Sequence, residues 1–251
     1  TLNSGIKNGN VTLKLYAQWK PNTYTIKFFG NTHSGGSTAS MSMTYDVANN
    51  LTANGFTKTG YVFAGWNTSA DGTGTTYTDK QSVKNLTATN GATINLYAQW
   101  KPISYTIKFN GNGATSGSTA SMSMTYDVAK NLTTNGFKRT SDNSKGWNTK
   151  ADGSGTSYND KQSVKNLTTT NGATITLYAK WTKIISTITF DSNEGSEVSA
   201  IRGDAGDKVT EPTSPTRANY KFDGWYTDNE TFKNKYVFDV MPENDITLYA
   251  K

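Results

Sequence analysis

The feature that most constrains this chain is an internal repeat of 81 residues. Trp19, Trp100 and Trp181 lie 81 positions apart, and residues 20–100 align on residues 101–181 without a gap, with 58 identities in 81 positions. A fixed period of this kind is typical of tandem structural units that each build a small core. The 251 residues are therefore expected to form several small modules and not one large domain.

The repeat divides the chain into four parts. Residues 20–100 and 101–181 are two full repeats, and residues 182–251 are a third, shorter and diverged repeat that keeps the same order of motifs. Residues 1–19 end in a match to the end of a repeat, so we interpret them as the last strand of a truncated preceding unit. The chain also stops at Lys251 within the recurring pattern, and we expect it to be a piece of a longer protein.

Four segments of each full repeat have the alternation and composition of strands. In the first repeat they are residues 24–28, residues 40–45, residues 61–66 and the closing segment 92–100, rich in β-branched and aromatic side chains. These segments predict a mainly antiparallel sheet in each repeat. The four-residue linker 101–104 contains a proline, which favours semi-rigid connections and an elongated rod of modules.

One short helix is predicted over residues 79–86. Asp79 is a suitable N-cap residue, and apolar side chains then recur at a spacing of three. The fold class expected from the sequence is thus β-rich with a minor helical contribution.

Composition excludes several classes of site. The chain has no cysteine and a single histidine, His33, so a disulfide scaffold, a thiol nucleophile, a thiolate metal site and a multi-histidine metal site are excluded. No stretch approaches the 18 apolar residues of a membrane span. No nucleophile–base pair or carboxylate constellation stands out, and the acidic residues of the third repeat lack the spacing of a calcium loop. We expect no catalytic residue, no cofactor and no metal.

The third repeat carries a family resemblance. It contains Thr-Ile-Thr-Phe at 187–190, Phe-Asp-Gly-Trp at 222–225 and Ile-Thr-Leu-Tyr-Ala-Lys at 246–251. This order resembles the internalin-type B repeat, also called the Listeria–Bacteroides repeat, and the two full repeats look like a longer version of it. The resemblance implies tandem, small β-grasp-like modules, without enzymatic activity, in secreted or wall-attached bacterial surface proteins.

The tryptophans of the repeats fall into two groups. Trp66, Trp147 and Trp225 each follow a glycine at the end of an alternating strand, and this pattern predicts core anchors.

The second group is the candidate contact site, and it stands beside the linkers: Trp19, Trp100 and Trp181, with Lys101 adjacent. We favour packing of these indoles between neighbouring repeats. The alternative is an exposed aromatic platform that stacks on sugar rings. For the packed arrangement, substitution of Trp100 and Trp181 by alanine is expected to loosen the rod and leave each module folded.

The two full repeats differ most at one segment. Residues 60–64 read Gly-Tyr-Val-Phe-Ala, whereas residues 141–145 read Ser-Asp-Asn-Ser-Lys, five consecutive differences. The loss of two aromatic side chains puts a regular third strand in repeat two in doubt and predicts that repeat two is the least stable module.

Charge is distributed unevenly along the chain. Residues 1–183 hold 18 basic and 7 acidic side chains, a net +11, and residues 184–251 hold 7 basic and 12 acidic, a net −5. The lysines are scattered and no nucleic-acid motif is present, so nucleic acid is not expected as a partner.

The expected partners are neighbouring repeats of the same chain, with a host or cell-wall glycan or protein as a further one. The function that we favour is a non-enzymatic stalk or spacer of a bacterial cell-surface protein, which projects another domain from the cell wall. The alternative is an adhesin module that binds glycans through linker-side aromatics and basic residues.

Overall fold

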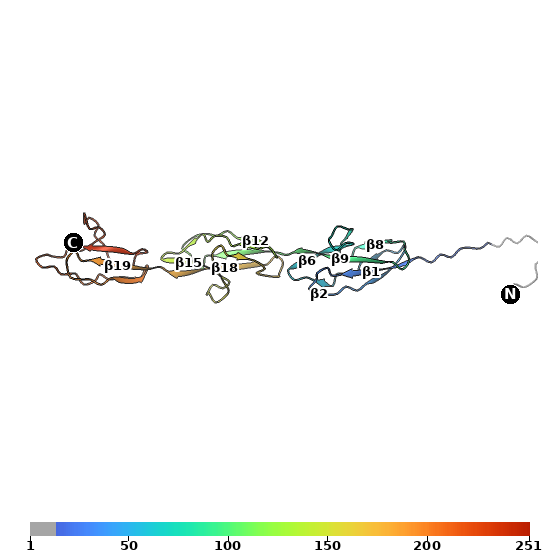
Figure 1. Cartoon of the computed structure of the whole chain (residues 1–251), viewed down its shortest axis with the longest axis horizontal. Helices are drawn as coiled ribbons and strands as arrows, with labels where there is room; N and C mark the ends of the chain where they lie inside the picture. The colour runs from blue at the N-terminus through green and yellow to red at the C-terminus, as the bar shows by residue number, and fades with distance from the viewer. Residues whose placement is uncertain (1–13) are drawn as a thin grey trace, which may run out of the picture. The chain divides into compact units, whose positions relative to one another are not determined.

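The computed structural model describes residues 14–251, and its strands group by repeat (Figure 1). Within these residues the regular elements are all strands, with no helix. The chain divides into two compact units, Thr1–Lys101 and Pro102–Lys251, and the second unit contains repeats two and three. The β-rich class predicted from the sequence is confirmed, and each repeat builds its own main sheet.

Repeat one forms a five-stranded sheet in the order β3-β1-β9-β6-β7 and two small two-stranded sheets, β2-β5 and β4-β8. Its strands are β1 (Thr23–Phe29), β2 (Gly35–Gly36), β3 (Met41–Thr44), β4 (Asn49–Asn50), β5 (Phe56–Thr57), β6 (Tyr61–Asn67), β7 (Thr76–Tyr77), β8 (Ser82–Val83) and β9 (Thr93–Pro102). The four predicted strand segments therefore correspond to β1, β3, β6 and β9.

Strand β1 lies between two partners in this sheet, next to the central strand β9. It pairs antiparallel with β3 and parallel with β9, where Ile26 lies opposite Ile94. Its alternation places Tyr24, Ile26 and Phe28 in the core and the intervening side chains outside. The parallel pairing of the first and last long strands was not predicted from the sequence. The antiparallel pairs β1–β3 and β6–β7 follow the expected arrangement.

The helix predicted over residues 79–86 is wrong. The segment contains β8, which pairs with β4 in a two-stranded sheet. Asp79 does not cap a helix, because its carboxylate accepts the backbone N–H of Asn54 at 2.9 Å. Asn85 exchanges two hydrogen bonds with Asp46, one from the Asp46 N–H at 2.6 Å and one to its carboxylate at 2.8 Å. Contacts to distant segments thus outweigh the weak local helical preference.

Repeat two reproduces this topology, with its main sheet in the order β12-β10-β18-β15-β16. Its strands are β10 (Ser104–Asn110), β11 (Ser116–Gly117), β12 (Met122–Thr125), β13 (Lys130–Asn131), β14 (Phe137–Lys138), β15 (Asp142–Asn148), β16 (Ser157–Tyr158), β17 (Ser163–Val164) and β18 (Thr174–Lys183). The doubt about a third strand here is resolved, because β15 has the same seven-residue length as β6. The backbone ladder to β18 holds it in place, with an irregularity between Ser144 and Trp147.

Repeat three is a reduced version of the same sheet. It has four strands in the order β20-β19-β22-β21, and they are β19 (Ile185–Asp191), β20 (Ile201–Asp204), β21 (Trp225–Tyr226) and β22 (Ile246–Ala250). Strands β19 and β22 again pair in parallel, so the central pair is common to all three repeats.

The predicted core anchors are confirmed, because Trp66, Trp147 and Trp225 are at most 1% exposed. The glycine before each one has a positive φ, for example +134° at Gly65, where an added Cβ would lie 2.7 Å from the carbonyl oxygen of Tyr77. Glycine is therefore needed to turn the strand so that the indole enters the core while the neighbouring chain approaches closely.

Residues 1–13 of the predicted preceding unit lie outside the described residues. Residues 14–19 are exposed and belong to none of the strands. Their counterpart β9 pairs with β1 and β6, and residues 14–19 have no such partners in the described part of the chain. Their assignment to a preceding repeat stays a prediction.

Candidate functional site at the end of repeat two

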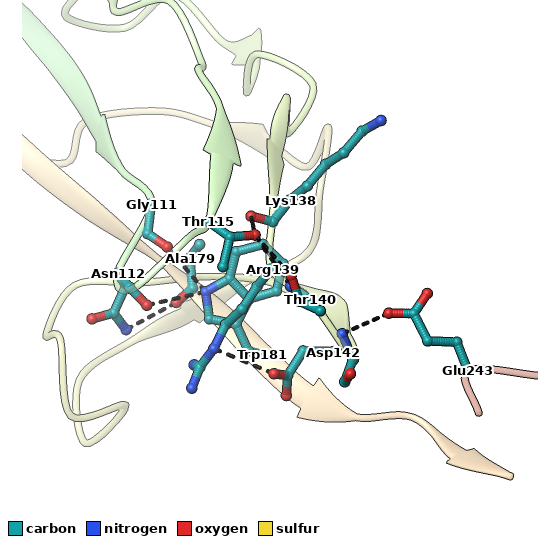
Figure 2. Close-up of polar contacts among 11 residues, drawn as sticks. Gly111, Asn112, Thr115, Lys138, Arg139, Thr140, Asp142, Ala179, Trp181 and Glu243 are labelled. Carbon is teal, nitrogen blue, oxygen red and sulfur yellow. Dashed lines mark hydrogen bonds and ion pairs between the residues drawn. The ribbon is translucent and has the colours of Figure 1, made fainter. Parts of the chain in front are cut away.

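The predicted contact residue Trp181 lies where three segments of repeat two meet (Figure 2). These are the loop after β10, the loop before β15 and the end of β18. The indole is half-buried and packs against the core of its own repeat. Its Nε1–H donates to the carbonyl oxygens of Gly111 at 3.0 Å and Asn112 at 3.1 Å. The indole thus packs on the core at this end of the repeat and is bonded to the loop after β10.

Asn112 gives the receiving loop its shape. Its φ of +47° is in the left-handed region, which asparagine tolerates better than most residues. Its side-chain amide donates to the carbonyl oxygens of Ala151 at 2.9 Å and Ala179 at 3.0 Å. This one side chain thus ties three segments together. Figure 2 shows its bond to Ala179 and the carbonyl groups of Gly111 and Asn112 beside Trp181. Asn31 makes the equivalent bonds in repeat one.

The other predicted contact residues have different environments. Trp100 is half-buried in repeat one, where its Nε1–H donates to the carbonyl oxygen of Gly30 at 2.9 Å. Its ring meets Phe63 edge-on, with centroids 5.7 Å apart. Trp19 is 91% exposed and Lys101 is exposed. Trp100 and Trp181 therefore share one arrangement within their own repeats, and Trp19 has a different one.

A second set of contacts joins repeat two to repeat three, and sequence reasoning missed it. Only Ile184 separates β18 from β19. Its N–H donates to the carbonyl oxygen of Ser141 at 3.0 Å, and its own carbonyl accepts the N–H of Ala205 at 2.8 Å. The N–H of Ser141 in turn donates to a carboxylate oxygen of Glu243 at 3.0 Å. The connecting residue is thus hydrogen-bonded to both repeats.

Residues 138–142 form the outer edge of this junction. Arg139 Nε lies 3.3 Å from the carboxylate of Asp142, whose side chain is 7% exposed. Ser141 adopts a φ of +61° between them. From the sequence, the run of polar residues at 141–145 predicts a loss of core side chains. The structure shows that two of these residues, Ser141 and Asp142, make polar contacts at the repeat junction.

An open groove of about 240 Å³ runs beside Trp181. Besides the indole, its lining includes Asn112, Arg139, Asp152 and Lys180. A groove lined by an aromatic ring, two basic residues and a carboxylate could contact a polar ligand such as a sugar. The Lys180 ammonium is held by the hydroxyl of Ser157 at 3.0 Å.

The loop after β6 and the loop after β15 each contain an aspartate whose carboxylate accepts hydrogen bonds from its own loop. In repeat one, Asp71 accepts from the Ser69 hydroxyl at 2.7 Å and from the hydroxyl and N–H of Thr73 at 2.7 and 3.0 Å. These bonds, that of Ser69 first, lower the pKa of Asp71 to about 2. In repeat two, bonds from the N–H and hydroxyl of Ser154 also lower the pKa of Asp152. Both are ionised at neutral pH and suit turn formation, not proton transfer.

The remaining candidate residues, the other acidic side chains and His33, do not form a metal-binding cluster in the described part of the chain. Within residues 14–251, no group of three or more His, Asp or Glu side chains is placed to hold a metal ion. His33 is exposed in its loop, with its ring edge-on to Phe56 at 4.7 Å. The described part of the chain also has no helix that could span a bilayer.

Comparison with known proteins identifies one family that matches all three repeats. A sequence profile of the Listeria-Bacteroides repeat domain matches residues 24–99, 105–180 and 187–251.

Three relatives are informative. The chain is 36% identical over 203 residues to a protein of Evansella cellulosilytica described as a Gly-rich membrane protein, covering 77% of this chain and 22% of that protein. It is 30% identical over 247 residues to another protein of that organism described as a membrane protein, covering 95% and 33%. It is 39% identical over 111 residues to Internalin H of Listeria monocytogenes, covering 42% and 19%. The chain thus spans between 19% and 33% of the length of these relatives.

Proposed function

Because the chain belongs to the Listeria-Bacteroides repeat family, we propose that it is a non-enzymatic spacer region of a bacterial cell-surface protein. In this role its tandem repeats hold another domain away from the cell wall. The relatives described as membrane proteins and Internalin H support a location at the cell surface. Because the chain spans at most 33% of their length, the projected domain belongs to the remainder of such a protein.

The observation that carries this proposal is the connection between repeats two and three. A flexible linker between modules has unbonded backbone groups and several residues free to rotate. Ile184 instead bonds through its N–H to Ser141 and through its carbonyl to Ala205. A connection of one residue with both polar groups engaged restricts bending, and restricted bending is what a spacer requires.

Pulsed electron paramagnetic resonance tests the proposal directly. The chain has no cysteine, so Lys165→Cys and Glu197→Cys place one spin label on an exposed position of each of repeats two and three. A spacer gives one narrow distance distribution between these labels. A broad distribution, like that of two modules on a flexible tether, would contradict it.

The groove beside Trp181 favours a second function, an adhesin module that binds glycans. In this case Lys180 and Arg139 contact the polar groups of the ligand, and the indole stacks on a sugar ring. Titration of the chain with cell-wall polymers and host glycans separates the two functions. Saturable binding that Lys180→Gln weakens, and that the exposed control Lys165→Gln leaves unchanged, would favour the adhesin. A spacer shows no saturable binding.

A further inference from the structure

In repeats one and two, the first long strand of the repeat pairs in parallel with the last one. Strand β1 lies beside β9 over five residue pairs, which include Ile26 opposite Ile94. Strand β10 lies beside β18 over five pairs as well, which include Ile107 opposite Ile175. Because strands in a parallel pair run in the same direction, the chain enters each repeat at one end of this ladder and leaves it at the other end.

This arrangement decides how a pull along the chain acts on a repeat. The pull draws β1 toward its N-terminal end and β9 toward its C-terminal end, so the two strands are forced to slide past each other. The hydrogen bonds between them lie across the direction of sliding and share the load. Strands that are drawn apart from one end instead lose their hydrogen bonds one after another. Sliding therefore requires several bonds to break together, and it has the higher barrier.

Two kinds of contact between β1 and β9 add to this resistance. Beside the first residue pair of the ladder, the N–H of Thr25 donates to the carbonyl oxygen of Ala92 at 2.9 Å. On the core face, Ile26 of β1 and Leu96 of β9 are both fully buried, so sliding also disrupts close packing. Repeat two has the equivalent bond, from Thr106 to Ala173, and the equivalent buried side chains.

Short connections carry a pull from one ladder to the next. Only Ile103 separates β9 from β10, and only Ile184 separates β18 from β19. Ile103 is 2% exposed, and its carbonyl oxygen accepts the N–H of Tyr126 at 3.0 Å. The closing strand of one repeat thus continues almost directly into the opening strand of the next. A pull loads the ladders without first extending a long linker.

We propose that the repeats resist tension, and that the parallel pair of opening and closing strands keeps each one folded while the chain is pulled. The strands that bear the load are β1 and β9 in repeat one and β10 and β18 in repeat two. The proposal rests on the spacer function, because a chain that holds another domain on a cell surface transmits the forces that act on that domain. It goes beyond that function by assigning the resistance to one pair of strands.

Single-molecule pulling on the full chain, which has no cysteine of its own, tests the proposal through introduced cysteine handles. Lys20→Cys with Lys101→Cys, both at exposed positions, applies the force along β1 and β9. Lys20→Cys with Val47→Cys applies it to the adjacent ends of β1 and β3, where Thr23 lies opposite Thr44, and draws these antiparallel strands apart from one end. The first pair of handles should give a several-fold higher unfolding force, because forced unfolding follows the height of the barrier. Equal forces would overturn the proposal.

Two matched pairs of histidines separate resistance to force from stability at equilibrium. Lys27 and Asn95 lie opposite each other across β1 and β9, and Thr25 and Ser42 lie opposite each other across β1 and β3. Nickel ions that bridge either pair of histidines should raise the denaturant concentration needed for unfolding. With the handles at positions 20 and 101, nickel should raise the unfolding force of Lys27→His/Asn95→His and leave that of Thr25→His/Ser42→His nearly unchanged. A force that nickel raises equally in both, or does not raise in the first, would overturn the proposal.

These measurements fail separately from the test of the spacer function. A broad label distance between repeats two and three would contradict the spacer and leave the unfolding forces of repeat one unaffected. Equal unfolding forces for the two placements of the handles would contradict the resistance to tension and leave the label distance narrow.

Discussion

The backbone N–H of Ser141 in repeat two donates a hydrogen bond to the Glu243 carboxylate of repeat three, 102 residues later in the chain, at 3.0 Å. Repeat one has Gly60 at the position of Ser141. Gly206 of repeat three also lies against this serine, since a Cβ built on it would be 3.0 Å from the Ser141 hydroxyl oxygen. The most divergent segment of the two full repeats thus contains a residue that contacts the next repeat.

The first prediction concerns this bond. Glu243→Ala removes the acceptor, and we expect the label distance between repeats two and three to broaden while both repeats stay folded. The free-energy cost is about 0.5–1.5 kcal/mol, since the bond is exposed to water. Glu230→Ala is the control, because it removes another exposed acid of repeat three and leaves the bond between Ser141 and Glu243 in place. An unchanged distribution in Glu243→Ala would show that Ile184 alone fixes the junction.

The second prediction concerns the stability of repeat two. Phe63 is half-buried against Trp66 and Trp100, whereas its counterpart Ser144 is exposed. Ser144→Phe should therefore stabilise repeat two by about 1–2 kcal/mol, from apolar burial and ring contacts.

The reverse change, Phe63→Ser, should destabilise repeat one by a similar amount, and amide hydrogen exchange within each repeat measures both. If neither substitution changes the exchange rates, position 63 contributes nothing to the core. Val62 is 37% exposed, so a further Asn143→Val change should add little beyond this phenylalanine.

The third prediction concerns the tryptophans at the repeat ends. Trp181 packs on its own core and bonds to its own loop, so we expect Trp181→Ala to destabilise repeat two by about 2–4 kcal/mol. Trp181→Phe keeps most of the packing, loses the N–H donor and should cost about 1 kcal/mol. Denaturant unfolding followed by amide signals of β10 and β18 measures these changes. Preserved stability in Trp181→Ala, together with a broadened label distance, would instead support packing between repeats.

The fourth prediction concerns the glycine before each core tryptophan. Gly65→Ala should destabilise repeat one by about 2–4 kcal/mol, because φ is +134° and the new Cβ would lie 2.7 Å from the Tyr77 carbonyl oxygen. Gly91→Ala separates the effect of the positive φ from the effect of the close contact with the added Cβ. Gly91 also has a positive φ, +75°, but nothing lies within 4 Å of the added Cβ, so its cost should be about 1 kcal/mol. Equal losses in thermal unfolding would mean that φ alone accounts for the effect.

The fifth prediction concerns acid. The pKa of Asp71 is lowered from 3.8 to about 2 by the Ser69 and Thr73 hydrogen bonds. A lowered folded-state pKa gives a stabilising contribution that is fully present above about pH 4 and is lost as the pH falls through about 2. A carbon-13 titration of the Asp71 carboxyl should have its midpoint near 2. In Thr73→Val, which lacks the hydroxyl donor, the midpoint should move up toward 3.8. A midpoint near 3.8 in the unchanged chain would contradict these bonds.

Much of the architecture could be predicted from the sequence. The 81-residue period defined the repeats, and alternation identified the segments that became β1, β3, β6 and β9. The Gly-Trp pairs identified Trp66, Trp147 and Trp225 as core residues. These features are local or periodic: alternating side chains must point to opposite faces of a strand, and a large apolar ring must leave water.

Only the tertiary structure decided how these segments meet. The side chains of β1 and β9 would alternate in the same way in a parallel or an antiparallel pair, so their pattern did not reveal that the two strands run parallel. Residues 79–86 have a weak helical pattern, and it was Asn54 and Asp46, in other segments, that fixed their conformation. The bond from Ser141 to Glu243 likewise joins residues with no recurring spacing. Hydrogen bonds between distant segments depend on where the folded backbone places each donor and acceptor, and a periodic pattern of side chains does not specify that position.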